Sequence, residues 1–92
     1  MLNLIFEKGE VRRFEFTARS QKPNDPVVIT SAAWALYNTE TDALAAKGAG
    51  EVVRNTISVL VPFETEGKYM LEVTATIPPE IVKERIEMRV VK

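Results

Sequence analysis

Apolar and polar residues alternate most regularly along the chain between Tyr69 and Ile77. A period of two over nine residues is typical of a β-strand with one buried and one solvated face. The predicted buried face consists of Tyr69, Leu71, Val73, Ala75 and Ile77, and the opposite face of Met70, Glu72, Thr74 and Thr76. We therefore predict a central strand here, and the remaining elements are interpreted around it.

Two strands are predicted before residue 19. The segment Leu2–Glu7 alternates, and Gly9 then interrupts it at a position where glycine can adopt a positive φ. The segment Val11–Ala18 alternates again. Its predicted inner face is Phe14, Phe16 and Ala18, and its outer face is Arg13, Glu15 and Thr17. Two aromatic residues at positions i and i+2 of such a strand indicate core packing.

The middle of the chain contains a loop, a strand and a hairpin turn. Residues 19–26 are predicted to form a loop because prolines at 23 and 26 prevent continuous ladder pairing. In the strand Thr30–Tyr37, one face is formed by Ala32, Trp34 and Leu36, which predicts that Trp34 fills the centre of the core. The turn-favouring residues 38–42 are predicted to form a hairpin loop.

A weaker strand signal covers Leu44–Val53. Gly48 and Gly50 reduce strand character there, so we predict one irregular edge strand followed by a tight turn at Arg54-Asn55. The next strand is clear, with Ile57, Val59 and Val61 directed inward.

Residues 80–91 permit two interpretations. Pro79 could occupy the first position of a helix. Against a helix, apolar residues alternate with charged ones, and only Glu84 interrupts the pattern. Because periodicity is the primary signal, a strand is favoured.

These elements amount to about seven short strands and no convincing helix. We predict an all-β fold, an antiparallel β-sandwich of immunoglobulin-like type, in a single domain spanning residues 1–92. A chain of 92 residues has no room for a second core.

Composition narrows the possible functions. The 12 basic and 13 acidic residues are interspersed, so neither a nucleic-acid partner nor an anionic membrane is expected. The chain contains no cysteine and no histidine, which removes thiolate chemistry and the commonest general base. No Gly-x-Ser-x-Gly or Ser-x-x-Lys motif occurs, so we expect no enzyme, no cofactor and no small-molecule substrate. We also expect neither a signal peptide nor a transmembrane helix.

Two loop segments have a chemical interpretation as well as a simpler one. The segment Glu64-Thr65-Glu66, with Asp42, could offer oxygens to calcium, but the spacing of known calcium loops is absent and a solvated turn is favoured. Gly48-Ala49-Gly50 after Lys47 lacks the third glycine and the helix of a phosphate-binding loop. Accordingly, no catalytic, cofactor-binding or metal-binding residue is predicted.

Two further sets of residues could form surface features. The basic residues Arg12, Arg13, Lys83, Arg85 and Arg89 could form a stripe, but interspersed glutamates favour cross-strand charge pairs. Met70 and Met88 could form an exposed apolar patch, or Met88 could belong to the core.

The segment Gly67-Lys68-Tyr69-Met70-Leu71 resembles the start of the sixth strand of immunoglobulin-like domains. The resemblance implies that Tyr69 forms a tyrosine corner, that Leu71 replaces the half-cystine facing Phe14 or Phe16, and that Trp34 is the core tryptophan. The acidic residue usual four positions before the tyrosine is replaced by Thr65.

A narrower resemblance concerns small immunoglobulin-like virion proteins of tailed phages and prophages. It rests on Phe6-Glu7-Lys8-Gly9-Glu10, on Ile29-Thr30-Ser31-Ala32 after Pro26, on Trp34-Ala35-Leu36, and on Pro62, Thr65, Gly67 and Tyr69. It implies a structural protein of a tail, baseplate, neck or capsid decoration, located in the virion or the host cytoplasm, that contacts other virion proteins or forms a homo-oligomer.

The alternative is an immunoglobulin-like binding or spacer module of a bacterial surface protein system. In either case we expect function to depend on surfaces. The predicted contact surfaces are the strand Leu2–Glu7, the edge Leu44–Val53, and the loops 19–26 and 38–42.

Overall fold

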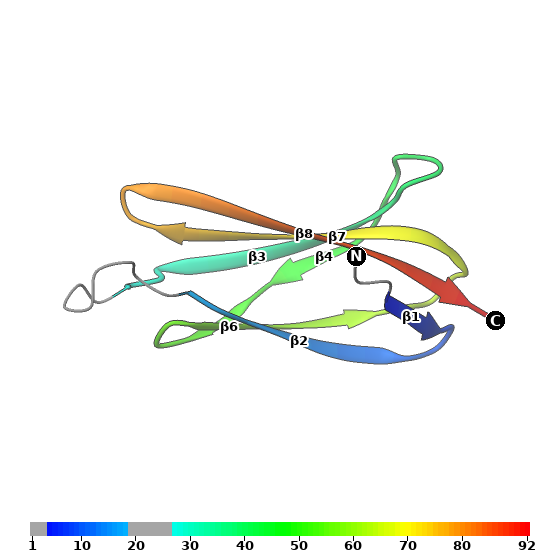
Figure 1. The fold of residues 1–92 in the computed structure, drawn as a ribbon, viewed down its shortest axis with the longest axis horizontal. Helices are drawn as coiled ribbons and strands as arrows, with labels where there is room; N and C mark the ends of the chain where they lie inside the picture. Colours follow the sequence, from blue (N-terminus) through cyan, green and yellow to red (C-terminus); the bar gives the residue numbers. More distant parts are fainter. Residues whose placement is uncertain (1–3, 19–26) are drawn as a thin grey trace.

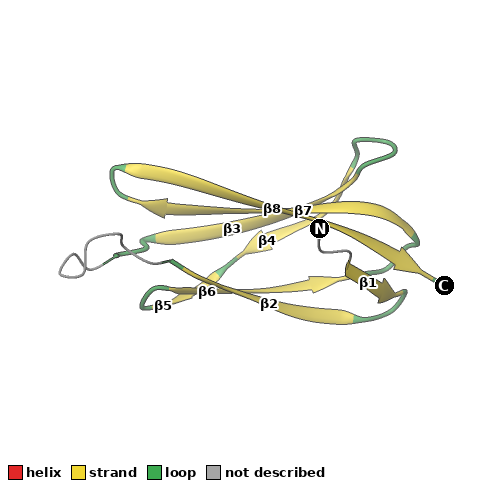
Figure 2. Cartoon of the chain, viewed as in Figure 1, coloured by secondary structure: helices red, strands yellow, loops and turns green. Residues whose placement is uncertain are grey.

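The computed structural model describes residues 4–18 and 27–92, and these residues form eight β-strands in two sheets (Figures 1 and 2). The strands are β1 (Leu4–Glu7), β2 (Val11–Thr17), β3 (Ser31–Asn38), β4 (Leu44–Ala49), β5 (Glu51–Val53), β6 (Thr56–Pro62), β7 (Gly67–Ile77) and β8 (Glu80–Val91). One sheet has the order β1-β8-β7-β3-β4 and the other β2-β6-β5. The all-β prediction is confirmed, and the described residues contain no helix.

The core lies between the two sheets and follows the predicted alternation. Along β7, Tyr69, Leu71, Val73 and Ala75 are buried. The opposing sheet contributes Ile57, Val59 and Val61 from β6, and Phe14 and Phe16 are partly buried against the same core. The predicted position of Trp34 is also confirmed, because only 8% of its surface is exposed.

The strand arrangement matches that of immunoglobulin domains: β2, β6 and β5 take the places of strands B, E and D in one sheet, and β3, β7 and β8 those of strands C, F and G in the other. Because β4 is an additional strand, β7 corresponds to the sixth strand of the seven-stranded pattern. Tyr69 forms the predicted corner: its hydroxyl donates a hydrogen bond to the backbone carbonyl oxygen of Thr65 at 2.8 Å. Because the acceptor is a backbone atom, the threonine in place of an acidic residue does not prevent this bond.

The predicted antiparallel sandwich is confirmed, with one parallel pair at the edge of the larger sheet. β1 runs parallel to β8, with Leu4 opposite Met88 and Glu7 opposite Val91. The short turn at Lys8-Gly9 then takes the chain into the second sheet, where β2 pairs with β6.

The prediction of one edge strand over Leu44–Val53 is wrong. The chain leaves the five-stranded sheet after β4 and enters the three-stranded sheet as β5, and Gly50 is the residue between them. A Cβ atom at Gly50 would lie 2.9 Å from the Cβ of Ala32, so this crossing passes too close to β3 for a side chain. Gly48 similarly makes room for Trp34, whose indole nitrogen would lie 2.8 Å from an added Cβ.

Residues 80–91 form a strand, as the alternation indicated. β7 and β8 make a long antiparallel hairpin in which Met70 is opposite Glu87 and Tyr69 is opposite Met88. Met88 is buried, whereas Met70 lies on the other face of the sheet, so the two methionines do not form a common patch.

Candidate interaction surfaces

Four strands lie at the edges of the two sheets: β1 and β4 in the larger sheet, β2 and β5 in the smaller. β8 is a further partial edge. Its residues 88–91 pair with β1, but no other described strand covers residues 80–87 on that side. The fold therefore leaves several runs of backbone groups without a strand partner among the described residues.

The predicted contact surfaces occupy several of these places. The described part of the first predicted surface is edge strand β1, and the Leu44–Val53 segment supplies edge strands β4 and β5. Residues 38–42 form the β3–β4 turn, in which the Asn38 side-chain oxygen accepts hydrogen bonds from the backbone N–H groups of Glu40 and Thr41. The beginning of the first surface, before Leu4, and the predicted loop 19–26 lie outside the described residues.

Most exposed large hydrophobic residues lie on strands with an open edge. Ile5 on β1 is 63% exposed and Val53 on β5 is 60% exposed. Val11 on β2, Leu44 on β4, and Ile81 and Val82 on β8 are also exposed. Val28 and Leu60 are the other large hydrophobic residues exposed in the described part of the chain.

The open edge of β2 was not among the predicted surfaces. Its paired phenylalanines correctly indicated core packing, but nothing in the local sequence shows which neighbour a strand lacks. The outward residues Arg13 and Glu15 are exposed. Arg13 Nη1 donates a hydrogen bond to Ser58 Oγ at 2.7 Å, and no ion pair involves Arg13 or Glu15 within the described residues.

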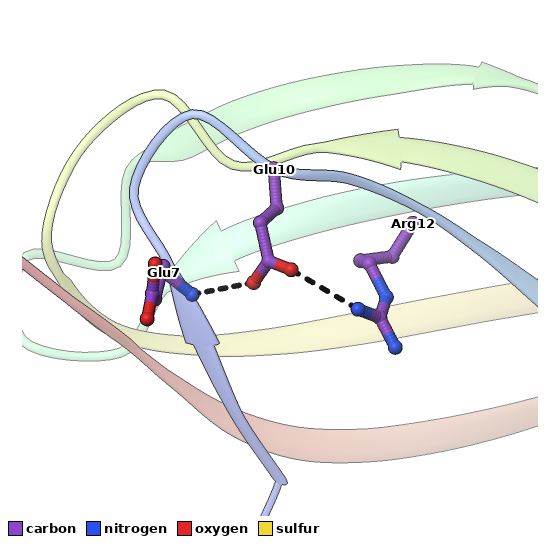
Figure 3. Close-up of polar contacts among 3 residues, drawn as sticks. All are labelled: Glu7, Glu10 and Arg12. Carbon is purple, nitrogen blue, oxygen red and sulfur yellow. Dashed lines mark hydrogen bonds and ion pairs between the residues drawn. The ribbon is translucent and has the colours of Figure 1, made fainter.

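The turn between β1 and β2 is fixed by Glu10 (Figure 3). One carboxylate oxygen accepts a hydrogen bond from the Glu7 backbone N–H at 2.6 Å, and the other accepts one from Arg12 Nη1 at 3.0 Å. The bond from Glu7 is the main cause of a lowered pKa at Glu10, and Arg12 adds to it. The Lys8-Gly9-Glu10 segment thus has a structural role in joining the sheets.

The outer face of the β7–β8 hairpin contains the cross-strand charge pairs that the sequence favoured. Glu72 on β7 lies 2.9 Å from Arg85 and 3.6 Å from Lys83, both on β8. Glu84 lies on the inner face by the alternation of the strand but is exposed, because no described strand covers this end of the hairpin on that face. An inward-facing charge on an open strand is a known obstacle to edge-to-edge aggregation.

An open groove of about 660 Å³ lies between the sheets. Its lining is mainly apolar, from residues such as Phe16, Ile57 and Val73, with Glu80 and Glu84 on β8. Glu64, Glu66 and Asp42 are exposed, and the described residues include no group of three or more His, Cys, Asp or Glu side chains arranged to hold a metal ion. No described segment is a helix able to span a membrane.

Comparison with known proteins supports the fold. No family model matches the sequence, and no curated protein matches it. Among solved structures, the crystal structure of CopC from Methylosinus trichosporium OB3b is similar, with a TM-score of 0.64 and 13% sequence identity. The match covers 96% of this chain and 82% of CopC. At this identity the likeness shows a shared β-sandwich fold alone.

Proposed function

We propose that this chain is a non-catalytic structural module that acts through protein–protein contacts made by its sheet edges. The observation that supports this function is the distribution of exposed aliphatic residues. Six of the eight exposed large hydrophobic residues lie on strands with an open edge: Ile5, Val11, Leu44, Val53, Ile81 and Val82.

An open edge offers two kinds of interaction at once. Its free backbone N–H and C=O groups can add a strand from a partner, and alternate side chains then contact that strand. Aliphatic residues beside the free backbone groups favour such an addition, because pairing removes their apolar surface from water. Charged residues on the same strands, such as Arg13 and Lys83, restrict which partners fit.

The assembly we propose is a phage or prophage virion, in which small β-sandwich modules contact copies of themselves and neighbouring subunits. Its support is the resemblance carried by the Lys8-Gly9-Glu10 turn and by the Gly67-Lys68-Tyr69 corner. In the structure the Lys8-Gly9-Glu10 turn joins the two sheets, and Gly67-Lys68-Tyr69 begins β7.

Particle purification tests this function. Virions induced from the source strain are separated on a density gradient, and the chain is quantified by mass spectrometry in every fraction. The proposal predicts that the chain sediments with the particles in a constant ratio to the major capsid protein. Its recovery only in the particle-free fractions, or in the cell envelope, would contradict a virion role.

A further inference from the structure

We propose that two copies of the chain associate through their β2 strands, which pair antiparallel about a two-fold axis at Phe14. Three strands from each copy would then form one continuous sheet, in the order β5-β6-β2-β2-β6-β5. This inference deepens the proposed function by naming a second copy as the partner of one open edge. It rests on the backbone geometry of β2 and on the order of charges along it.

The backbone of β2 presents suitable groups to such a partner. In antiparallel pairs, residues that exchange hydrogen bonds with one neighbour alternate with residues whose N–H and C=O groups point away. At the ends of β2, the Glu10 carbonyl accepts a bond from Phe63 N–H, and Ala18 N–H donates to the Asn55 carbonyl. The backbone groups of even-numbered residues therefore bond to β6 and to the residues next to it. The odd-numbered residues of β2 direct their N–H and C=O groups to the open edge.

The charge order selects one register. A two-fold axis at Phe14 places Arg13 of each copy directly opposite Glu15 of the other, on the outer face of the sheet. The neighbouring registers are unfavourable, because an axis at Arg13 or Glu15 sets that residue against its own copy. In the Phe14 register, Arg13 and Glu15 are also the residues whose backbone groups are free, so both backbone bonds and charge pairs form together.

The inner face is compatible with the same register. Phe14 would face its own copy, and Arg12 would lie opposite Phe16. Both phenylalanines are only partly buried in one copy. Arg12 already lies over an aromatic ring, with its guanidinium carbon 5.3 Å from the centre of Phe6, so its contact with an aromatic face fits its present environment.

The open part of β8 does not offer an equivalent register. An axis at Lys83, Glu84 or Arg85 sets that residue opposite its own copy. An axis at Ile86 would pair Arg85 with Glu87, but it would also place residues 81–84 opposite residues 88–91 of the second copy, a side of β8 that β1 already occupies. β8 therefore supplies a matched control: it is an open edge with charged outward residues, but without an accessible self-complementary register.

Sedimentation equilibrium on charge variants tests the pairing. We expect the wild-type chain to dimerise reversibly at concentrations up to about 1 mM, the range in which small interfaces act. Arg13→Glu or Glu15→Arg alone would place like charges together at two positions and raise the dissociation constant roughly tenfold. The double variant Arg13→Glu/Glu15→Arg exchanges the charges and should return the constant to near the wild-type value. Lys83→Glu, an equal change of net charge on β8, should leave it unchanged.

The double variant separates charge pairing from folding effects, since it also lacks the hydrogen bond from Arg13 to Ser58. Circular dichroism and thermal unfolding verify that each variant is folded. A wild-type chain that stays monomeric throughout, or a double variant as weak as the single ones, would overturn the β2 pairing. Neither result would affect the particle-sedimentation test, so failure of the dimer and failure of the virion role are distinguishable.

Discussion

At the residue scale, Tyr69 and Leu71 are neighbours on the buried face of β7 with different roles. Leu71 is 0% exposed, so Leu71→Ala should leave a cavity and lower the free energy of unfolding by about 2–5 kcal/mol. Tyr69→Phe removes only the hydrogen bond to Thr65 and should lower it by about 0.5–1.5 kcal/mol. Urea denaturation of both variants measures the difference. Equal losses would contradict the assignment of Leu71 to the core and of Tyr69 to the corner.

Gly50 is required for steric reasons where the chain crosses between the sheets. An alanine Cβ there would approach Ala32 Cβ to 2.9 Å and Ile57 Cγ2 to 3.1 Å. Gly50→Ala should therefore lower the unfolding free energy by about 1–3 kcal/mol through overpacking. Thermal unfolding measures the loss. The neighbouring exposed Ala49 provides the control, because Ala49→Ser should change the unfolding free energy little. A neutral Gly50→Ala would show that the crossing is not tightly packed.

At the scale of elements, the β1–β2 turn should respond to pH through Glu10. The folded state lowers the pKa of Glu10 from its ordinary value of 4.5, so the ionised carboxylate contributes stability above that pH. This contribution is lost as pH falls through the lowered folded pKa. Denaturation of wild type and Glu10→Gln at pH 7 should show the wild type more stable, and the difference should shrink as the pH falls below 4.5 and through the lowered folded pKa. A difference that is constant with pH would indicate that the carboxylate charge has no part in fixing the turn.

The open end of the β7–β8 hairpin should depend on Glu84 for its resistance to self-association. Glu84→Val would join Val82 and Ile86 into one apolar stripe on the inner side of an exposed strand. We expect light scattering to detect species larger than those of the wild type, because an inward charge that opposes edge pairing is lost. Glu87→Val, on the outer side, is the control. An unchanged size distribution for Glu84→Val would assign Glu84 no protective role.

At the scale of the whole molecule, the sandwich and most of its core were predictable from the sequence. Alternation along β7 and around Trp34 placed the buried residues correctly, because one face of each strand packs against the opposite sheet. The strand at residues 80–91 followed from the same rule. The structure also explains why Glu84 interrupts the alternation, because no described strand covers the inner face of the hairpin at that position.

The neighbours of each strand were not predictable in the same way. The sheet change at Gly50 depends on close contacts with Ala32 and Ile57, which are distant in the sequence. The parallel pairing of β1 with β8 joins the two ends of the described chain. For the same reason the open edge of β2 was missed: a strand's alternation shows which face is buried but not which edge lacks a partner.

Introduced cysteines can establish whether copies of this chain meet at β2 in the proposed register. The chain has no cysteine, so any disulfide must form between introduced residues. In the proposed pairing, position 13 of one copy lies opposite position 15 of the other at a Cα separation of about 5.5 Å, within the range of disulfides. Mixing Arg13→Cys with Glu15→Cys also keeps one Arg13–Glu15 pair intact.

Non-reducing electrophoresis after mild oxidation gives the result. We expect a covalent dimer when the two variants are mixed, and far less from either variant alone. A mixture of Lys83→Cys and Arg85→Cys on β8 should remain monomeric under the same conditions. Equal cross-linking of single variants and mixtures, or none in the β2 mixture, would contradict the pairing of β2 about Phe14.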